Sequence, residues 1–347
     1  MNVVINNDLL DICREDLDWS QFSNKNVLIT GANGILASYI VETILMLIKL
    51  KVIHNTHVLA LVRDKLKAAT RFKDYHNQKN ISFIVQDVSD PIVCSESIDI
   101  IIHAASQASP KYYGVDPVGT LTPNVIGTTN LLKLAKEKKV QDFIFFSSAE
   151  IYGNLNNSDA IKETDYGSLD PMNIRSCYAE SKRMGENICS SWFSQFNVPV
   201  KIIRPFHTYG PGMLIDDGRI FSDFVFNILN NQNLQIKSDG SARRAYCYLK
   251  DAIIGYFYVI LKGEIGEAYN VGNPYQEYSV KELADILISI FPEKSLNVEM
   301  NSAFSRLNYL PSTVNRFLPD THKIEALGWF PKVDVKDGFQ RTILSYS

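Results

Sequence analysis

The stretch NVLITGANGILASYI, residues 26–40, decides the fold of this chain. It starts as an apolar strand pattern, passes through Gly31 and Gly34, and continues at once as a helical pattern with a small residue at Ala37. Glycines at the first two positions let the backbone turn tightly and approach a pyrophosphate at the helix N-terminus, and a small third residue permits close helix–strand packing. The stretch therefore predicts a strand–turn–helix unit that binds a dinucleotide.

Further apolar runs follow along the chain, separated by helical patterns. The runs are 57–62, 81–88, 98–106, 142–150 and 198–206, and the helical patterns include 34–50, 117–137 and 173–197. The runs are apolar throughout and do not alternate, as expected for strands covered on both faces. Alternation of strand and helix predicts an α/β fold with a Rossmann-type, doubly wound parallel sheet.

The domain organisation expected from this pattern has three parts. Residues 1–25 form an acidic N-terminal helical extension, and residues 26–206 form the NAD(P)-binding Rossmann domain. After residue 207 the pattern loosens, with more turns and mixed strand and helix signals. We therefore expect residues 207–347 to form mainly a smaller C-terminal α/β substrate lobe, with about residues 240–275 returning to the Rossmann sheet.

Composition excludes several functional classes. A net charge of −3 argues against a nucleic-acid partner, because phosphate binding needs a basic field. The longest apolar stretch is interrupted by Glu42, Lys49 and Lys51, so it indicates a core helix and no membrane span. Five cysteines without a CxxC motif indicate a reducing cytoplasm, and six scattered histidines give no expectation of a metal site.

The residues after the second predicted strand bear on the choice of cofactor. A carboxylate at this position holds the adenosine ribose of NAD, whereas an arginine accommodates the 2′-phosphate of NADP. The sequence has Arg63 first and Asp64 next, so NAD is expected and NADP stays open because of Arg63. Asp87, at the end of the third predicted strand, is a candidate for the adenine edge.

RSCYAESKRMGE, residues 175–186, places Tyr178 and Lys182 on one helical face. A phenol with an ordinary pKa of about 10 is a poor base at pH 7, and a nearby ammonium group is expected to lower that pKa. The YxxxK pattern occurs four times in the chain, but only Tyr178 lies downstream of a polar strand end, 30 residues after Ser148. Tyr178 and Lys182 are therefore the predicted catalytic pair.

Five motifs together resemble the extended short-chain dehydrogenase/reductase family: TGANGIL, HAASQASP, SSAEIYG, YAESK and RPFHTYGP. Within it they look like the nucleotide-sugar epimerases, dehydratases and decarboxylases, over about residues 25–340. The resemblance implies that Tyr178 takes the proton of a sugar hydroxyl, that Ser148 relays or orients it, and that hydride passes to the nicotinamide. It also implies a nucleotide-diphosphate sugar as substrate and a homodimer formed through helices 117–137 and 173–197.

The same resemblance implies a set of cofactor contacts at the ends of the predicted strands. This set is Gly31, Asn33, Gly34, Ile35, Arg63, Asp64, Asp87, Val88, Ala104, Ala105, Ser106, Asn124, Tyr178, Lys182 and Pro205.

Three further segments are similar to UDP-glucuronate decarboxylases: residues 216–225, 240–251 and 315–329. By this likeness Arg219 and Arg243 are candidates for the diphosphate, since a guanidinium fork suits phosphate oxygens. Arg316 would be the arginine that reaches the active site from the C-terminal stretch. SPKYYGVDP, residues 109–117, is expected to border the substrate pocket, with Tyr112 or Tyr113 contacting the substrate.

SSAEIYG, residues 147–153, contains Ala149, which limits the set of reactions that the site could catalyse. In the family resembled, 4,6-dehydratases carry an acidic pair at Ala149 and Glu150, and decarboxylases carry serine then glutamate, with asparagine at His207. The C4-epimerases match the Ser-Ser-Ala of residues 147–149 but have no acid after it. Dehydration is therefore disfavoured and decarboxylation weakened, while Glu150 and His207 remain candidate proton carriers next to a carbonyl.

Four functions follow from these motifs. The leading expectation is redox-neutral epimerisation of a nucleotide-diphosphate sugar, with NAD kept bound. The alternatives are a UDP-glucuronate decarboxylase-like enzyme, an NADPH-dependent reductase of a nucleotide-linked keto sugar supported by Arg63, and a non-catalytic dinucleotide-binding protein.

Overall fold

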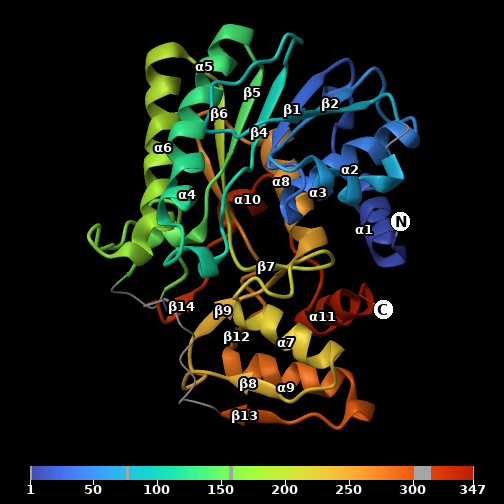
Figure 1. The fold of residues 1–347 in the computed structure, drawn as a ribbon, viewed down its shortest axis with the longest axis vertical. Helices are drawn as coiled ribbons and strands as arrows, with labels where there is room; N and C mark the ends of the chain where they lie inside the picture. Colours follow the sequence, from blue (N-terminus) through green and yellow to red (C-terminus); the bar gives the residue numbers. More distant parts are fainter. Residues whose placement is uncertain (1, 76–77, 156–158, 301–313, 347) are drawn as a thin grey trace.

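The computed structural model describes residues 2–75, 78–155, 159–300 and 314–346. Its centre is a sheet of seven strands in the order β11-β6-β5-β4-β1-β2-β3, all paired in parallel (Figure 1). The expected α/β fold with a doubly wound parallel sheet is confirmed. In chain order the strands are β1 (Asn26–Thr30), β2 (His57–Val62), β3 (Ile81–Val85), β4 (Ile100–His103), β5 (Asp142–Phe146), β6 (Val200–Pro205) and β11 (Ala268–Val271).

Helices cover both faces of this sheet. On one face lie α1 (Val3–Cys13), α2 (Ile35–Lys49), α3 (Lys65–Arg71) and α8 (Leu249–Lys262). On the other lie α4 (Pro117–Thr122), η4 (Pro123–Gly127), α5 (Thr128–Lys138) and α6 (Cys177–Phe196). Alternate strand residues enter the two cores, so Val27 and Ile29 pack against α2 and α8 while Leu28 packs against α5 and α6. This double burial is the reason the strands read as continuous apolar runs.

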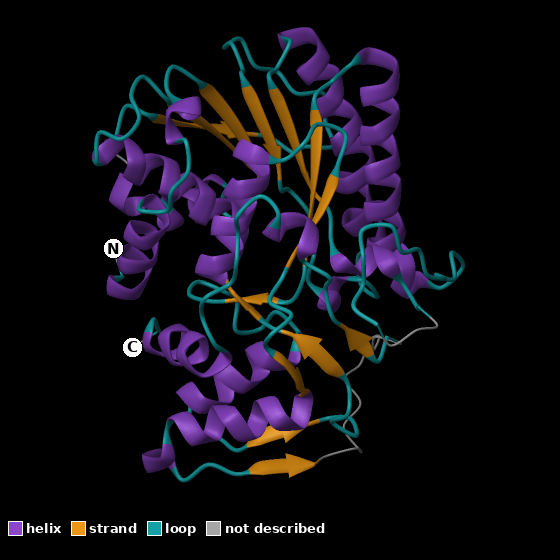
Figure 2. Cartoon of the chain, turned by 180° about the vertical axis from the view of Figure 1, so that it is seen from behind, coloured by secondary structure: helices purple, strands orange, loops and turns teal. Residues whose placement is uncertain are grey.

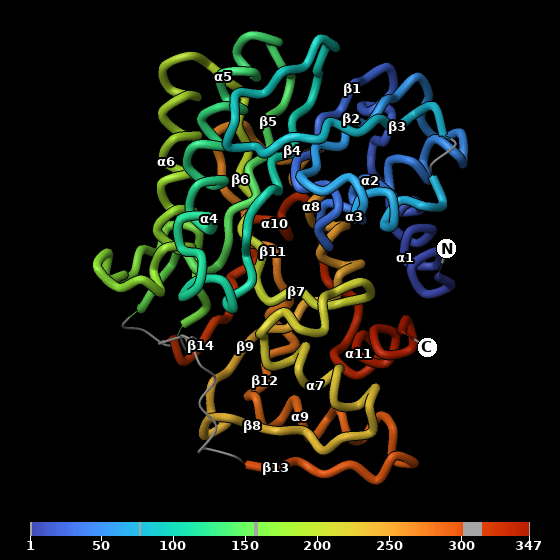
Figure 3. Tube along the Cα trace, in the orientation of Figure 1, coloured from blue at the N-terminus to red at the C-terminus, as the bar shows by residue number. Residues whose placement is uncertain are grey.

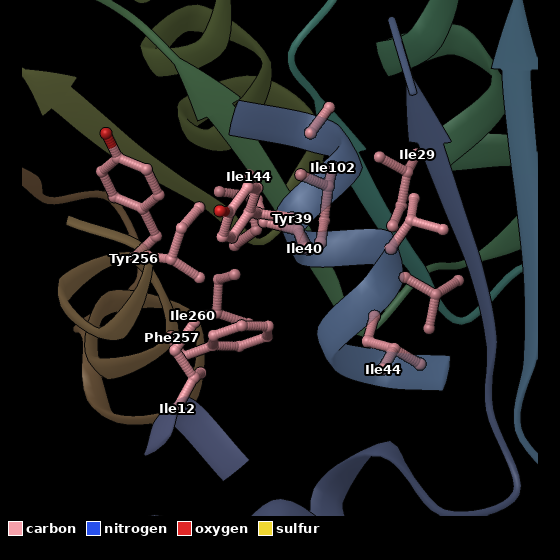
Figure 4. Close-up of a cluster of buried hydrophobic side chains, with 14 of the residues drawn as sticks. Ile12, Ile29, Tyr39, Ile40, Ile44, Ile102, Ile144, Tyr256, Phe257 and Ile260 are labelled. Atoms are coloured by element: carbon pink, nitrogen blue, oxygen red, sulfur yellow. The ribbon is translucent and has the colours of Figure 1, made fainter. Parts of the chain in front are cut away.

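The N-terminal helix α1 is part of the first of these cores. Figure 4 shows Ile12 of α1 close to Phe257 of α8, with Ile40 of α2 and the strand residues Ile29 and Ile102 farther in. Asp8 of α1 accepts a hydrogen bond from the Tyr248 hydroxyl (2.7 Å). The helix therefore joins the sheet's helical cover to the C-terminal part of the chain.

Several predicted elements differ from the structure in their bounds. The runs 98–106 and 142–150 leave the sheet at His103 and Phe146, so the polar residues that follow lie in loops at its carboxyl edge. The predicted helix 117–137 is divided by the π-helical turn η4, which starts at Pro123. Proline has no backbone N–H to donate to the preceding turn, so a regular α-helix is interrupted there.

A smaller lobe, built mainly from residues after 207, lies at one end of the main sheet (Figures 2 and 3). Its strands pair as β12-β9-β14, β10-β7 and β13-β8, and its helices α7, α9 and α11 share one apolar core. The bounds are β7 (Thr208–Tyr209), α7 (Ile220–Leu229), β8 (Leu234–Ile236), β9 (Arg243–Ala245), β10 (Cys247–Tyr248), β12 (Glu277–Ser279), α9 (Val280–Ile290), β13 (Val298–Met300), β14 (Arg316–Phe317) and α11 (Val335–Leu344). The short helix α10 (His322–Glu325) returns to the main sheet and packs against β11 and α8. Within the described ranges, no helix is long and apolar enough to cross a membrane.

Candidate active site

The loop between β1 and α2 is shaped for a close approach of backbone and ligand. Gly31 has a φ of +63°, and a Cβ there would lie 2.7 Å from the Cα of Ala105. The amide of Gly34 donates to the carbonyl of Gly31 (2.8 Å), and no side chain caps the N-terminus of α2 at Gly34. The first amides of α2 are thus left for an anion, as a pyrophosphate requires.

The other predicted cofactor residues gather along the carboxyl edge of the sheet. Ala104, Ala105 and Ser106 follow β4, Val88 follows β3, Pro205 ends β6, and Asn33 and Ile35 flank Gly34. This edge is where open α/β sheets bind ligands.

Two buried polar atoms at this edge fit a bound cofactor. The Ser106 hydroxyl and the Asn124 Oδ1 atom are buried without a hydrogen-bond partner among the described residues. The Asn124 amide nitrogen donates to the Thr120 carbonyl (3.1 Å) and the Ser181 hydroxyl (3.0 Å), which fixes the orientation of the side chain. Buried polar groups are rarely left unpaired in proteins, so these atoms fit the polar edge of a dinucleotide.

At the adenosine end, Arg63 and Asp87 form an ion pair (3.6 Å) across the ends of β2 and β3. Asp64 instead caps α3, because its carboxylate accepts from the amides of Leu66 (2.9 Å) and Lys67 (3.0 Å). Aspartate is a favoured residue at this capping position. Asp64 therefore holds a helix, and Arg63 and Asp87 stay the predicted contacts of the adenosine end.

The predicted catalytic residues come together. Ser148, after β5, accepts a hydrogen bond from the Glu150 amide (3.2 Å), and its hydroxyl lowers the pKa of the Tyr178 phenol near the start of α6. The Lys182 ammonium donates to the Phe146 carbonyl (2.6 Å) and lies 5.9 Å from the centre of the Tyr178 ring. The end of β5 and the first turns of α6 therefore place all three side chains in one site.

The electrostatics of the pair differ from the expectation. Burial raises the pKa of Tyr178, and the Ser148 hydrogen bond with the Arg219 charge only partly offsets it. Burial also lowers the pKa of Lys182 to about 7. The predicted lowering of the phenol pKa by Lys182 is not seen in this structure, because desolvation outweighs the lowering by Ser148, Arg219 and Arg175.

Tyr113, predicted as a substrate contact, packs against the catalytic phenol instead. The two rings stack with centroids 5.3 Å apart and an interplanar angle of 13°. The Tyr113 hydroxyl donates to the Ala108 carbonyl (3.0 Å). Glu150 forms an ion pair with Arg175 (3.3 Å), a residue that the sequence analysis did not single out.

Arg219 lies at the same end of the site as the catalytic tyrosine. It precedes α7, forms an ion pair with Asp217, and donates to the carbonyl of Ala108 (3.0 Å). The positive charge of Arg219 acts on both Tyr113 and Tyr178. Arg219 therefore lies near the hydroxyl of the predicted catalytic tyrosine and not beside Arg243.

The other two predicted arginines lie together on the small sheet. Arg243 of β9 and Arg316 of β14 are register partners, and both contact Glu277 of β12. Arg243 also pairs with Glu282 (3.0 Å). This face of the sheet is a cluster of arginine–glutamate pairs.

The next residues of β9 and β14 face the other way. Arg244 and Phe317 are register partners, and the Arg244 guanidinium carbon lies 5.2 Å from the Phe317 ring centre. The His207 ring lies 5.8 Å from Phe317, and the Arg244 charge acts on it. The Arg244 guanidinium donates to the carbonyls of Arg243 (2.7 Å), Asn315 (3.0 Å) and Val314 (2.7 Å), so it lies on the His207 side of the small sheet and is held by the backbone there. Sequence reasoning missed it because two adjacent arginines cannot be assigned to faces until the strand pairing is known.

Ala149 and His207 lie in apolar surroundings beside the predicted site. Ala149 is buried in an apolar cluster with Phe206 and Phe317. Burial, with the charges of Arg244 and Arg219, lowers the pKa of His207 well below its usual range. The imidazole is therefore neutral at pH 7 and is a poor proton carrier, contrary to the role expected for it.

Residues 27–272 match the family described as NAD dependent epimerase/dehydratase. The chain belongs to this family. Its NAD dependence agrees with the glycine loop and the unpaired polar atoms, so NAD is the cofactor. The expected assignment to the nucleotide-sugar group of extended short-chain dehydrogenases is thereby confirmed.

Curated relatives support the same assignment. The chain is 32% identical over 319 residues to UDP-glucuronic acid decarboxylase 6 of Arabidopsis thaliana, covering 91% of this chain and 87% of the relative. It is 30% identical over 333 residues to UDP-glucuronic acid decarboxylase 1 of Danio rerio, covering 94% and 74%.

Solved structures share the fold over nearly the whole chain. The UDP-glucuronic acid 4-epimerase of Bacillus cereus, in complex with UDP-glucuronic acid and NAD, matches with a TM-score of 0.77 and 25% identity, covering 92% of this chain and 98% of that chain. The dTDP-glucose 4,6-dehydratase of Bacillus anthracis, in complex with NAD, matches with a TM-score of 0.75 and 20% identity, covering 93% and 96%. Decarboxylase, epimerase and dehydratase thus share one scaffold, and side chains must decide the reaction.

Proposed function

We propose that this protein epimerises a nucleotide-diphosphate sugar at C4, with NAD held throughout the cycle. The observation that carries the proposal is the lack of a second proton carrier around the catalytic trio in the described part of the chain. Ala149 is apolar, His207 is neutral, and Glu150 is paired with Arg175. Epimerisation at C4 needs only one acid–base group and one hydride carrier, whereas the other reactions of the group need more.

Bound NAD would accept a hydride from the sugar and return it. It would be held by the backbone of the loop from Gly31 to Gly34, by Ser106 and Asn124 at the strand ends, and by Lys182. These residues lie on the carboxyl edge of the sheet, where the family binds its cofactor.

The proton of the C4 hydroxyl would pass to the Tyr178 phenolate. Ser148, whose hydroxyl lowers the pKa of the phenol, would hold the oxygen of the sugar hydroxyl in line for this transfer. The raised pKa of Tyr178 makes the phenolate a strong proton acceptor once formed, and the Arg219 charge favours its formation. The resulting 4-keto sugar regains the same proton from Tyr178 after the ring has turned its other face to the cofactor.

Decarboxylation of a nucleotide-linked uronic acid is the second candidate. It is favoured by the 32% identity to a UDP-glucuronic acid decarboxylase over 91% of this chain. Against it, the arginine expected to reach the active site, Arg316, is bound to Glu277 on the face of β14 opposite Phe317. Ala149 also stands where these enzymes were expected to carry a serine.

We also propose a homodimer formed through α4 and α6. Exposed apolar side chains lie along these helices and the adjoining turns: Val115, Val118, Ile126, Ile174 and Met184. A row of apolar side chains on an outer helical layer is typical of a protein–protein interface.

Turnover of a panel of sugars tests the reaction. UDP-glucose, UDP-galactose, UDP-xylose, UDP-glucuronate and the corresponding dTDP-hexoses would be incubated with the protein, and products would be separated by anion exchange. Interconversion of C4 epimers without released CO2 supports the proposal. Stoichiometric CO2 from UDP-glucuronate would establish the decarboxylase instead.

A further inference from the structure

The ring of Tyr113 links the catalytic tyrosine to a buried arginine. Tyr113 stacks on Tyr178, and both side chains are almost fully buried. The guanidinium carbon of Arg175 lies 4.8 Å from the centre of the Tyr113 ring. The Tyr113 hydroxyl donates to the Ala108 carbonyl, which fixes the far end of the ring. A shift of Arg175 would therefore move the Tyr113 ring against Tyr178.

Arg175 is itself held firmly. Its side chain is only 15% exposed, and its Nη2 atom is bound to Glu150 (3.3 Å). Its Nε atom is buried with no hydrogen-bond partner in the described part of the chain. It belongs to η6 (Ile174–Ser176), just before α6, and Asn173 caps this turn by accepting from the Arg175 amide (2.9 Å).

A desolvated guanidinium over an aromatic ring gives the stronger form of cation–π contact. An arginine at a surface would lose this attraction to water, but Arg175 is shielded by Glu150 and the tyrosine pair. Nothing in the hydrogen bonding of Arg175 requires this burial, since one of its donors is left unpaired. We therefore attribute the burial of the Arg175 side chain to its contact with the Tyr113 ring and not to its own hydrogen bonds.

We propose that Arg175 is a positioning residue for Tyr178, holding the phenol in line with Ser148 through the Tyr113 ring and countering Glu150 beside it. The inference rests on the proposed function to the extent that Tyr178 is its proton carrier. It is specific to this chain's own contacts and involves no contact between Arg175 and the substrate.

Charged and polar groups face the Tyr178 phenol from every element packed around it. They are Ser148 after β5, Glu150 of η5 (Ala149–Tyr152), Tyr113 after η3 (Pro110–Tyr112), Arg175 of η6, Lys182 of α6 and Arg219 before α7. Burial raises the pKa of the phenol, Arg219 and Arg175 lower it, and Glu150 raises it. Loss of Arg175 removes one of the two arginine charges that oppose Glu150 and the burial of the phenol, so formation of the phenolate becomes harder.

Three variants test the role. Arg175→Met keeps the length of the side chain but removes its charge, and Arg175→Lys keeps the charge but loses the planar fork. Arg341→Met is the matched control, because Arg341 also lies over a tyrosine ring, 5.9 Å from the centre of Tyr248, and also pairs with a carboxylate, Asp337 (2.7 Å). Arg341 is in α11 and has no part in the site.

The first readout needs no substrate. In protein labelled with ¹³C at the tyrosine Cζ, the Tyr178 resonance is assigned by its loss in Tyr178→Phe. We expect this resonance to move and broaden in Arg175→Met at pH 7.5, and to stay near its wild-type position in Arg175→Lys and Arg341→Met. An unmoved Tyr178 resonance in a folded Arg175→Met variant overturns the inference.

The second readout is kinetic, on the nucleotide sugar that the wild type converts. We expect Arg175→Met to lower kcat about tenfold with little change in KM and to shift the acid limb of the pH profile upward, with Arg175→Lys recovering most of the loss. A rise in KM alone would make Arg175 a substrate contact and overturn the positioning role. If the wild type converts no nucleotide sugar, the proposed function fails while the resonance still decides the role of Arg175.

Discussion

Arg316 donates two hydrogen bonds to the carboxylate of Glu277, at 2.5 and 2.9 Å. The pair joins β14 to β12 across β9, on the face of the small sheet opposite Phe317. This pairing ties β14 to β12 within the lobe. The proposed epimerisation needs no arginine here to reach the sugar, and this gives the first prediction.

Arg316→Gln should change kcat/KM on the converted nucleotide sugar by less than about tenfold, because a residue outside the reacting centre affects only the packing of the lobe. The measurement is steady-state kinetics, with thermal unfolding as the control for stability. A loss of several hundredfold in a folded variant would return Arg316 to the active site and favour decarboxylation.

Tyr178→Phe and Ser148→Ala should each lower kcat by about 10²- to 10⁴-fold, because each removes a group on the path of the proton. Each substitution removes a single oxygen atom from a well-packed site, so the melting temperature and NAD content should stay close to those of the wild type. Full activity in either variant would refute the mechanism.

Gly31→Ala should abolish retention of NAD during purification. The added Cβ would lie 2.7 Å from a backbone atom of Ala105, and the residue would keep an unfavourable φ of +63°. Mass spectrometry of the denatured protein measures the bound dinucleotide. NAD in wild-type amount would show that the loop does not cradle the pyrophosphate.

Arg244 and Arg243 should behave differently although they are neighbours. Arg244 donates to the carbonyls of Arg243, Val314 and Asn315, whereas Arg243 is paired with Glu277 and Glu282. Arg244→Gln should lower the free energy of unfolding by about 1–3 kcal/mol, because it leaves backbone carbonyls without their donor. Arg243→Gln should lower it by less than about 1 kcal/mol, because its ion pairs are partly exposed. Denaturant unfolding of both variants decides, and equal losses would contradict this difference.

Asp8→Asn should change how stability depends on pH. Burial raises the pKa of Asp8 to about 6, so the folded protein binds this proton more tightly than the unfolded chain does. The stabilisation from the protonated form is complete below the unfolded pKa and is lost as pH rises through about 6. Denaturant unfolding should show the variant gaining about 1 kcal/mol on the wild type between pH 5 and 8, and a gap independent of pH would contradict this.

Much of this architecture follows from local sequence patterns. Gly31, Gly34 and the apolar runs identify the strand–turn–helix unit and the buried parallel sheet, because both depend on neighbouring residues. Ser148, Tyr178 and Lys182 were found for the same reason, since one follows a strand end and the others share a helical turn. The division of the helix 117–137 was missed although Pro123 marks it, because the helical period continues through the break.

The residues that the sequence did not reveal depend on long-range pairing. The register of β9 against β12 and β14 decides which of Arg243 and Arg244 lies on the side of the small sheet that contacts His207. The stack of Tyr113 on Tyr178 and its contact with Arg175 bring the residue after η3 against η6 and the start of α6, more than 60 residues later in the chain. The low pKa of His207 likewise arises from burial and from Arg244 and Arg219, which no local pattern shows.

The measurement that tests the central claim most directly is turnover of the nucleotide-sugar panel in D2O without added NAD, followed by ¹H NMR of the products. Epimerisation at C4 by hydride removal and return predicts a product with no solvent deuterium on any carbon of the sugar. Deuterium at C3 or C5 would show that a proton was removed next to the ketone. Deuterium at C5 together with released CO2 would show decarboxylation, and either result would contradict the proposed reaction.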